Sequence, residues 1–165
     1  MKVRMNIKMN SVMKTLYDEV ESSRITSSAN LSIELLGLVE PGFMVVDGIV
    51  LLKTQEQIAK SVKLDNFPDP TGYECFVNHV HIEDYLSDSE LDSNALLKQG
   101  IALANKIVEE LSSLFPGKPF KVIVGANESG CSVRFHLVRS GENWLSDDLD
   151  KYSQEAILVL ETSPI

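Results

Sequence analysis

Two of the chain's three histidines lie one residue apart, in the stretch ECFVNHVHIEDY at residues 74–85. The alternation in residues 74–82 predicts a β-strand, and side chains two residues apart on a strand point to the same face. His79 and His81 would then project side by side, which is the arrangement that a His-x-His metal pair requires. The first candidate chemistry is therefore metal binding.

A zinc site needs a third protein ligand, and the candidates are His136, Glu83 and Asp84. Such a site would make the protein a small metal-dependent hydrolase or lyase. The alternative is a half-polar sheet face opposite a core face that contains Phe76, Val80 and Ile82. We expect this second arrangement, without metal or cofactor, because a His pair with no confirming context is a weak motif.

The charge around the two histidines makes a further prediction. Residues 83–92 contain five Asp or Glu and no Lys or Arg. Neighbouring negative charge favours the protonated imidazole, so we expect both pKa values to be raised. If the pair lies on a partly solvated face, replacing both His79 and His81 by alanine leaves the fold intact.

The two cysteines are too few for a disulfide framework. Cys131 alternates with Val133 and Phe135, so we expect it to be a buried small hydrophobe. On the expected strand Cys75 lies about 13 Å from His79, too far for a Cys–His nucleophile. We therefore expect no thiol catalysis.

A second group of chemically distinctive residues lies in RFHLVRSGENWLSDDLDKY, residues 134–152. Trp, Tyr and Arg are the residues most enriched where proteins bind one another. This segment therefore predicts a protein-binding surface made of Arg134, His136, Arg139, Trp144, Asp147, Asp148 and Tyr152. In the alternative interpretation, Trp144 fills the end of the core beneath a short helix that Ser146 caps.

Hydrophobic periodicity and turn residues predict the elements that hold these groups. We expect helices at 10–23, 31–39 (or a buried strand there), 53–64 with Thr54 as N-cap, 93–115, and a short one from Asp147. We expect strands at 74–82 and 156–161 and hairpins at 43–52 and 120–139, with a loop at 65–73. The sequence thus predicts one α+β domain over residues 1–165, in which helices pack on one face of a mostly antiparallel sheet of five to six strands.

Charge divides this domain into two parts. Residues 1–40, a helical segment, hold five basic and five acidic residues. The body at 41–165 holds ten basic and nineteen acidic residues and carries the whole net charge of −9. Such a body repels nucleic acid. Because no apolar run is long enough to cross a bilayer and no signal peptide is evident, we expect a cytoplasmic protein and no membrane partner.

These observations favour binding over catalysis. We expect a small bacterial protein-binding domain, in its most concrete form an immunity-type inhibitor that holds a basic toxin partner. The metal-dependent enzyme and a structural homo-oligomeric subunit are the alternatives.

Overall fold

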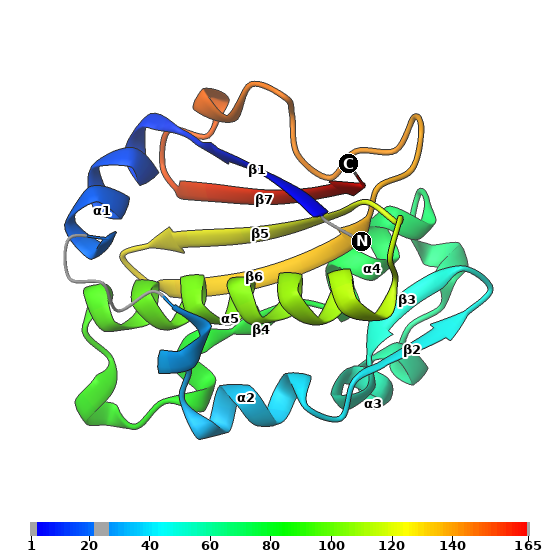
Figure 1. The fold of residues 1–165 in the computed structure, drawn as a ribbon, viewed down its shortest axis with the longest axis horizontal. Helices are drawn as coiled ribbons and strands as arrows, with labels where there is room; N and C mark the ends of the chain where they lie inside the picture. The colour runs from blue at the N-terminus through cyan, green and yellow to red at the C-terminus, as the bar shows by residue number, and fades with distance from the viewer. Residues whose placement is uncertain (1–2, 22–26, 165) are drawn as a thin grey trace.

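The computed structural model describes residues 3–21 and 27–164. Its centre is a five-stranded antiparallel sheet in the order β1-β7-β5-β6-β4 (Figure 1). The strands are β1 (Val3–Met9), β4 (Val80–His81), β5 (Phe120–Asn127), β6 (Gly130–Leu137) and β7 (Ala156–Pro164). A separate hairpin pairs β2 (Phe43–Val46) with β3 (Ile49–Leu52). The predicted α+β class is confirmed.

The inner face of the sheet carries the main core. Helix α5 (Ser93–Leu114) runs along β5 and β6 on this face, and both α1 (Ser11–Glu21) and α2 (Ile33–Val39) contact α5 (Figure 1). Apolar residues at spacings of three and four make one side of α5 continuously buried, and they pack on Val122, Val124, Val133 and Phe135. The Asp92 side chain accepts a hydrogen bond from the Asn94 N–H and caps the helix. Of the described helices, none is long and apolar enough to cross a bilayer.

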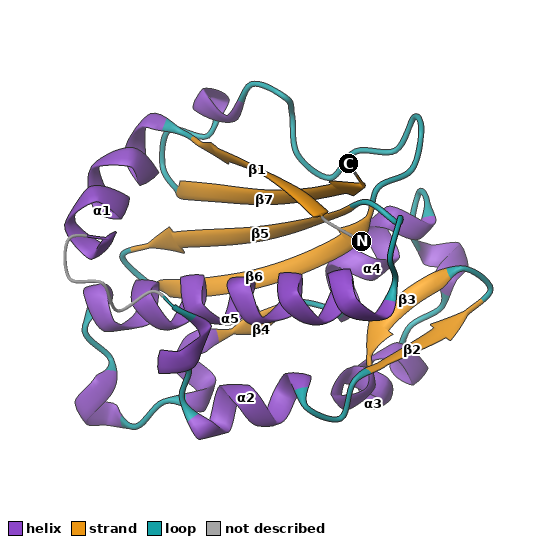
Figure 2. Ribbon diagram, viewed as in Figure 1, coloured by secondary structure: helices purple, strands orange, loops and turns teal. Residues whose placement is uncertain are grey.

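The outer face of the sheet has a smaller core. Ile123, Ile157 and Val159 are buried there under Leu145 and Leu149, which belong to the segment that connects β6 to β7. This connecting segment, residues 138–155, is mostly loop and contains one 3-10 turn, η6 (Leu149–Lys151) (Figure 2). Both faces of the sheet are therefore covered, one by helices and the other in part by a long loop.

The largest correction concerns residues 74–82, which do not form one strand. Residues Pro70–Val77 form helix α4, and only Val80–His81 pair with β6. The Asp69 side chain accepts a hydrogen bond from Gly72 N–H, and Pro70 at the first helical position has the φ that a helix start needs. The loop predicted at 65–73 therefore ends in a helix start, and Phe76 is exposed instead of lying in the core.

Other local predictions were partly right. The hairpin predicted at 43–52 is present, and its Asp47–Gly48 turn has positive φ at both residues, 51° and 78°. The helix expected at 53–64 is a 3-10 turn, η2 (Lys53–Gln55), followed by α3 (Glu56–Ser61). Thr54 is not its N-cap, because the Thr54 hydroxyl donates to the Leu38 carbonyl.

Four further differences lie at the chain ends and in the connections. Strand β1 was not expected, and residues 22–23 of the helix expected at 10–23 lie outside the described residues. Two 3-10 turns, η4 (Ile82–Tyr85) and η5 (Asp88–Glu90), occupy the acidic segment. The helix expected from Asp147 is the turn η6, whose cap is Asp148, while Ser146 accepts a hydrogen bond from the Asp148 N–H.

Candidate functional site

A hollow of about 240 Å³ lies on the outer face of the sheet near the β5–β6 turn. One row of its residues crosses three strands, since His81 of β4 pairs with Ser132 of β6, and Ser132 with Gly125 of β5. Ser132 has a small side chain and Gly125 has none, so the sheet surface is recessed between the larger neighbouring side chains. We call this hollow the trough.

Two carboxylates occupy space that side chains on the β5–β6 hairpin would otherwise fill. A Cβ on Gly125 would lie 2.3 Å from Glu155 Oε1, and a Cβ on Gly130 would lie 2.5 Å from Glu83 Oε1. Glu83 Oε2 also accepts a hydrogen bond from Cys131 N–H at 3.1 Å. The two glycines therefore let both carboxylates lie close against the hairpin at the border of the trough.

Arg134, two residues beyond Ser132 on β6, borders the trough at the end away from the β5–β6 turn. Its Nη2 lies 2.9 Å from His79 Nε2, and Nη1 donates to the Cys75 carbonyl at 3.4 Å. The guanidinium carbon lies 4.7 Å from the centre of the Trp144 ring, in a cation–π contact. Within the described parts of the chain, no carboxylate forms a salt bridge with Arg134.

The two histidines do lie side by side, with ring centroids 4.4 Å apart, although no long strand places them. The pKa of His79 is lowered to about 4, by burial first and then by the positive charge of Arg134 and His81. The expectation of a raised pKa was therefore wrong for His79, because the acidic segment does not outweigh burial and a neighbouring guanidinium. His79 is a neutral hydrogen-bond acceptor for Arg134, whereas His81 is exposed and lies 3.5 Å from the Glu83 carboxylate.

The structure brings part of the predicted binding surface together. Trp144 is 41% exposed, and Asp147 and Asp148 are exposed beside it on the connecting segment. Tyr152 is half-buried, and its hydroxyl accepts a hydrogen bond from Ser146 N–H at 3.0 Å. Trp144, Asp147 and Asp148 therefore form an exposed group, and Tyr152 belongs to a supporting group of residues that are more buried.

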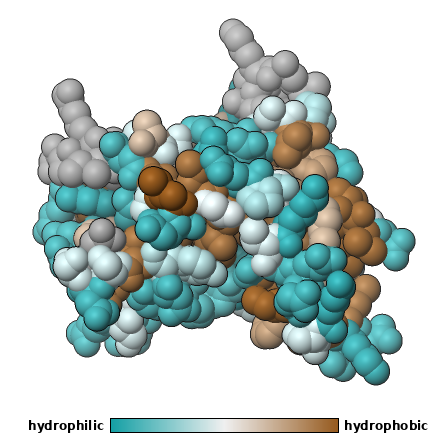
Figure 3. Space-filling model, turned by 90° about the horizontal axis from the view of Figure 1, so that it is seen from below, coloured by the Kyte–Doolittle hydropathy of each residue, from teal (hydrophilic) through white to brown (hydrophobic). Residues whose placement is uncertain are grey.

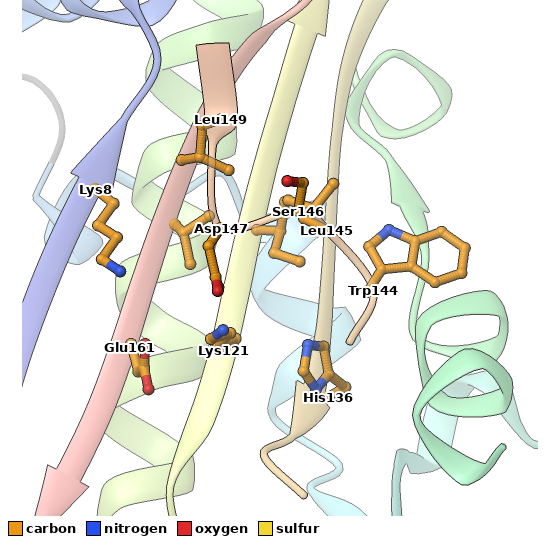
Figure 4. Close-up of a pocket in the computed structure, with 11 residues that line it drawn as sticks. Lys8, Lys121, His136, Trp144, Leu145, Ser146, Asp147, Leu149 and Glu161 are labelled. Carbon is orange, nitrogen blue, oxygen red and sulfur yellow. The ribbon is translucent and has the colours of Figure 1, made fainter. Parts of the chain in front are cut away.

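His136 belongs to the supporting group. It is only 2% exposed, and its Nδ1 lies 2.9 Å from the Leu137 carbonyl. Figure 4 shows it near Trp144 in a narrow recess that Lys121 also borders. Burial lowers its pKa.

Arg139 is part of a buried structural network that the sequence did not reveal. It donates to both carboxylate oxygens of Glu74, at 2.8 Å and 2.9 Å. Glu74 is fully buried and also accepts hydrogen bonds from the backbone N–H groups of Val50 and Leu137. Asn78, one helical turn further along, accepts a hydrogen bond from Leu52 N–H and donates to the carbonyls of Val50 and Phe135, so α4 joins the edges of β3 and β6.

The structure also places the predicted metal ligands and the two thiols. In residues 3–21 and 27–164, no group of three or more His, Cys, Asp or Glu side chains is placed to hold a metal ion. The two thiols are buried, and burial raises the pKa of both Cys75 and Cys131 to about 12. Protonated, buried thiols are poor nucleophiles.

Sequence reasoning missed Glu155 and the glycine positions, although weak signals were present. Gly125 interrupts a run of β-branched residues, which suggests close approach of another group. Glu155 directly precedes the last strand, but its position across from Gly125 depends on the pairing of β5 with β7. No spacing in the sequence specifies that pairing.

A second hollow, of about 410 Å³, lies between the β2–β3 hairpin and α3, and Met44, Val46, Ile49, Leu51 and Tyr73 line it. Hydrophobic surface gathers at the right of Figure 3, the side on which Figure 1 places this hairpin. Exposed apolar surface of this kind often contacts other molecules.

Comparison with known proteins gives one family. Residues 8–165 match the family described as "Uncharacterized protein PM0498 family". The chain is similar to the "Uncharacterized protein PM0498" of Pasteurella multocida (strain Pm70), with 29% identity over 133 residues that cover 74% of this chain and 78% of that protein. No solved structure matches.

Proposed function

The chain belongs to the PM0498 family, and we propose that it is a protein-binding domain that holds a basic partner. In the most concrete form of this proposal it is an immunity-type inhibitor of a basic bacterial toxin. The binding surface is the exposed part of the segment 138–155, with Trp144 at its centre.

The observation that carries the proposal is the way in which Trp144 is presented. The ring is 41% exposed although it is the chain's only tryptophan and most tryptophans are largely buried. Arg134 contacts the ring and itself bonds to His79 and to the Cys75 carbonyl, so it holds the ring in place. A rigid aromatic group held half in solvent is well suited to be a binding anchor.

The charge beside Trp144 indicates the kind of partner. Asp147, Asp148 and Asp150 are exposed within six residues of it, and Lys151 is the one basic residue of this run. Such a surface attracts basic proteins at long range and repels acidic ones. Together with the net charge of −9, it favours a basic partner.

The test is recovery of the partner from the source cell by affinity capture, followed by measurement of association and dissociation rates. We expect Trp144→Ala to increase the dissociation rate at least about tenfold, as loss of an interface anchor does. We expect the double change Asp147→Asn, Asp148→Asn to lower the association rate and its salt dependence.

Glu34→Gln is the matched control, since Glu34 is an exposed acid on α2, which packs against α5 on the inner side of the sheet. It should leave both rates unchanged. An association rate that does not vary between low and high salt, or a Trp144→Ala variant that binds as the wild type does, would refute the proposal.

The metal-dependent hydrolase or lyase remains a second candidate because His79 and His81 lie in contact. Its test is metal analysis of protein purified without a histidine tag. Stoichiometric metal, together with stabilisation by added Zn²⁺, would favour this candidate over protein binding.

A further inference from the structure

The trough holds charged groups of both signs that form no salt bridge with one another, although burial lowers the pKa of Arg134 and the negative charge of Glu155 acts against this effect. Arg134 forms no salt bridge with any described residue, and the Glu155 carboxylate has no hydrogen-bond partner among them. Both side chains are partly buried, where an unpaired charge is costly. Bound groups of opposite sign would satisfy both.

The positions of these charges are separated along the sheet. Glu155 lies over Gly125, which is level with Ser132, and Arg134 is two residues further along β6, a rise of about 7 Å. Glu83 lies over Gly130, which is on the far side of Ser132 from Arg134. The negative groups therefore gather toward the β5–β6 turn, and the positive group lies toward Trp144.

The Arg134 guanidinium is also fixed in place before any ligand binds. His79, whose pKa of about 4 keeps it neutral, accepts from Nη2, and the guanidinium carbon lies 4.7 Å from the centre of the Trp144 ring. Neutral partners orient the guanidinium without cancelling its charge, so it remains able to bind an anionic oxygen.

The space between these groups has the size of a small organic molecule. The trough measures about 240 Å³, roughly the liquid volume of eight water molecules. A smaller recess of about 70 Å³, bordered by Arg134, Trp144, Leu145 and Glu155, lies beside it. Neither space is large enough for a folded element of a partner.

We propose that the trough binds a small zwitterion of the amino-acid class, with its ammonium group between Glu83 and Glu155 and its carboxylate on Arg134. This site adjoins the surface proposed for protein binding, because Arg134 contacts Trp144, and it does not depend on that function. The separation of the charges favours a ligand whose two charged groups stand several bonds apart over one in which they share a carbon.

The experiment is an amide NMR titration of the intact protein with glycine, γ-aminobutyrate and ε-aminocaproate. Butyrate and n-butylamine serve as probes that carry only one of the two charges. We expect saturable shifts at Gly125 and Ser132, with γ-aminobutyrate or ε-aminocaproate binding at least about tenfold more tightly than either single-charge probe, a difference of about 1.4 kcal/mol.

Variants test each end of the site. Glu155→Gln should remove the preference for an ammonium group, and Arg134→Gln the preference for a carboxylate, while Glu128→Gln, an exposed acid on the β5–β6 turn, should change neither. Ser132→Phe should fill the trough and abolish binding, with dispersed amide signals showing that the protein is folded.

Two results would overturn the proposal. One is the absence of saturable shifts with every zwitterion up to about 50 mM, well above the millimolar range of weak ligands. The other is binding of n-butylamine as tight as that of the zwitterions, which would leave Arg134 without a role. Neither result affects the protein-binding proposal, which is measured with the partner and the Trp144→Ala variant.

Discussion

Glu74→Ala should be among the most damaging single substitutions in this protein. The Glu74 side chain is 0% exposed and receives four hydrogen bonds, two from Arg139 and one each from the backbone N–H groups of Val50 and Leu137. Alanine would leave the guanidinium without its carboxylate and both N–H groups without an acceptor. It would also disconnect the β2–β3 hairpin from the edge of β6.

The magnitude follows from these contacts. Removing one partner of a buried ion pair costs about 3–5 kcal/mol. Each buried N–H left without an acceptor adds about 1–3 kcal/mol, although relaxation and water entry reduce the total. We therefore expect a loss of at least about 3–5 kcal/mol, a large part of the roughly 5–15 kcal/mol by which a domain is stable.

Urea denaturation followed by circular dichroism measures this loss. With an m-value of about 2 kcal/mol/M, the midpoint should fall by roughly 2 M. Arg139→Ala should cost less than Glu74→Ala, because it leaves both N–H bonds of Glu74 in place, and the double mutant should cost much less than the sum. The control Glu34→Ala, on an exposed position of α2, should stay within about 0.5 kcal/mol. A loss below about 1 kcal/mol for Glu74→Ala would show that the network does not hold the hairpin to the sheet.

Four further outcomes are expected. The pKa of His79 is about 4 in the folded protein against about 6.5 when unfolded, so the unfolded chain binds more protons between these values and stability should fall as pH drops from 6.5 to 4. His79→Gln should flatten the dependence of unfolding free energy on pH. An NMR titration that finds His79 protonated at pH 5.5 would contradict this. The double change His79→Ala, His81→Ala should still give a folded protein by circular dichroism, and neither Zn²⁺ nor a chelator should move the wild-type melting temperature. A sharp drop of the melting temperature in the double variant, together with the same drop in wild-type protein treated with the chelator, would restore the metal interpretation. Cys75 and Cys131, with pKa values near 12, should resist a thiol reagent until the protein unfolds, and rapid labelling of the native protein would refute this. Gly100→Ala would place a Cβ 2.5 Å from Cys131 Sγ and should lower the unfolding free energy, measured in urea, by about 1–3 kcal/mol. Adding Cys131→Ala should recover part of this loss. Equal stability of the single and double variants would show that the contact relaxes freely.

Local signals predicted most elements correctly where one pattern agreed with its flanking residues. The apolar stripe of α5 lies between the Asp92 cap and Pro116–Gly117, and the Asp47–Gly48 turn has the positive φ values that its residues suggest. The prediction failed at residues 74–82, where alternation over a short apolar run was mistaken for a strand. The Asp69–Pro70 start signal was present there, but it was assigned to the preceding loop.

The candidate site could be predicted only in part for a related reason. Sequence spacing singled out His79, His81, Arg134 and Trp144 because their residue types are distinctive. It could not show that Arg134 would lower the pKa of His79, since these residues are 55 positions apart and meet only through the packing of α4 and β4 on β6.

The sequence by itself determined the α+β class, the charge of the body, the hairpins and the main helix, because each depends on residues close together in the chain. Only the tertiary structure decided that Glu74 and Arg139 are structural, that Trp144 is held by Arg134, and that Glu155 lies over Gly125. The first and the last of these contacts join residues 65 and 30 positions apart, and the contact of Trp144 with Arg134 depends on how the segment after β6 folds back over the sheet. Their energies depend on burial and strand pairing. Hydrophobic periodicity encodes which face of an element is buried, but it does not encode which polar side chain will lie across from another.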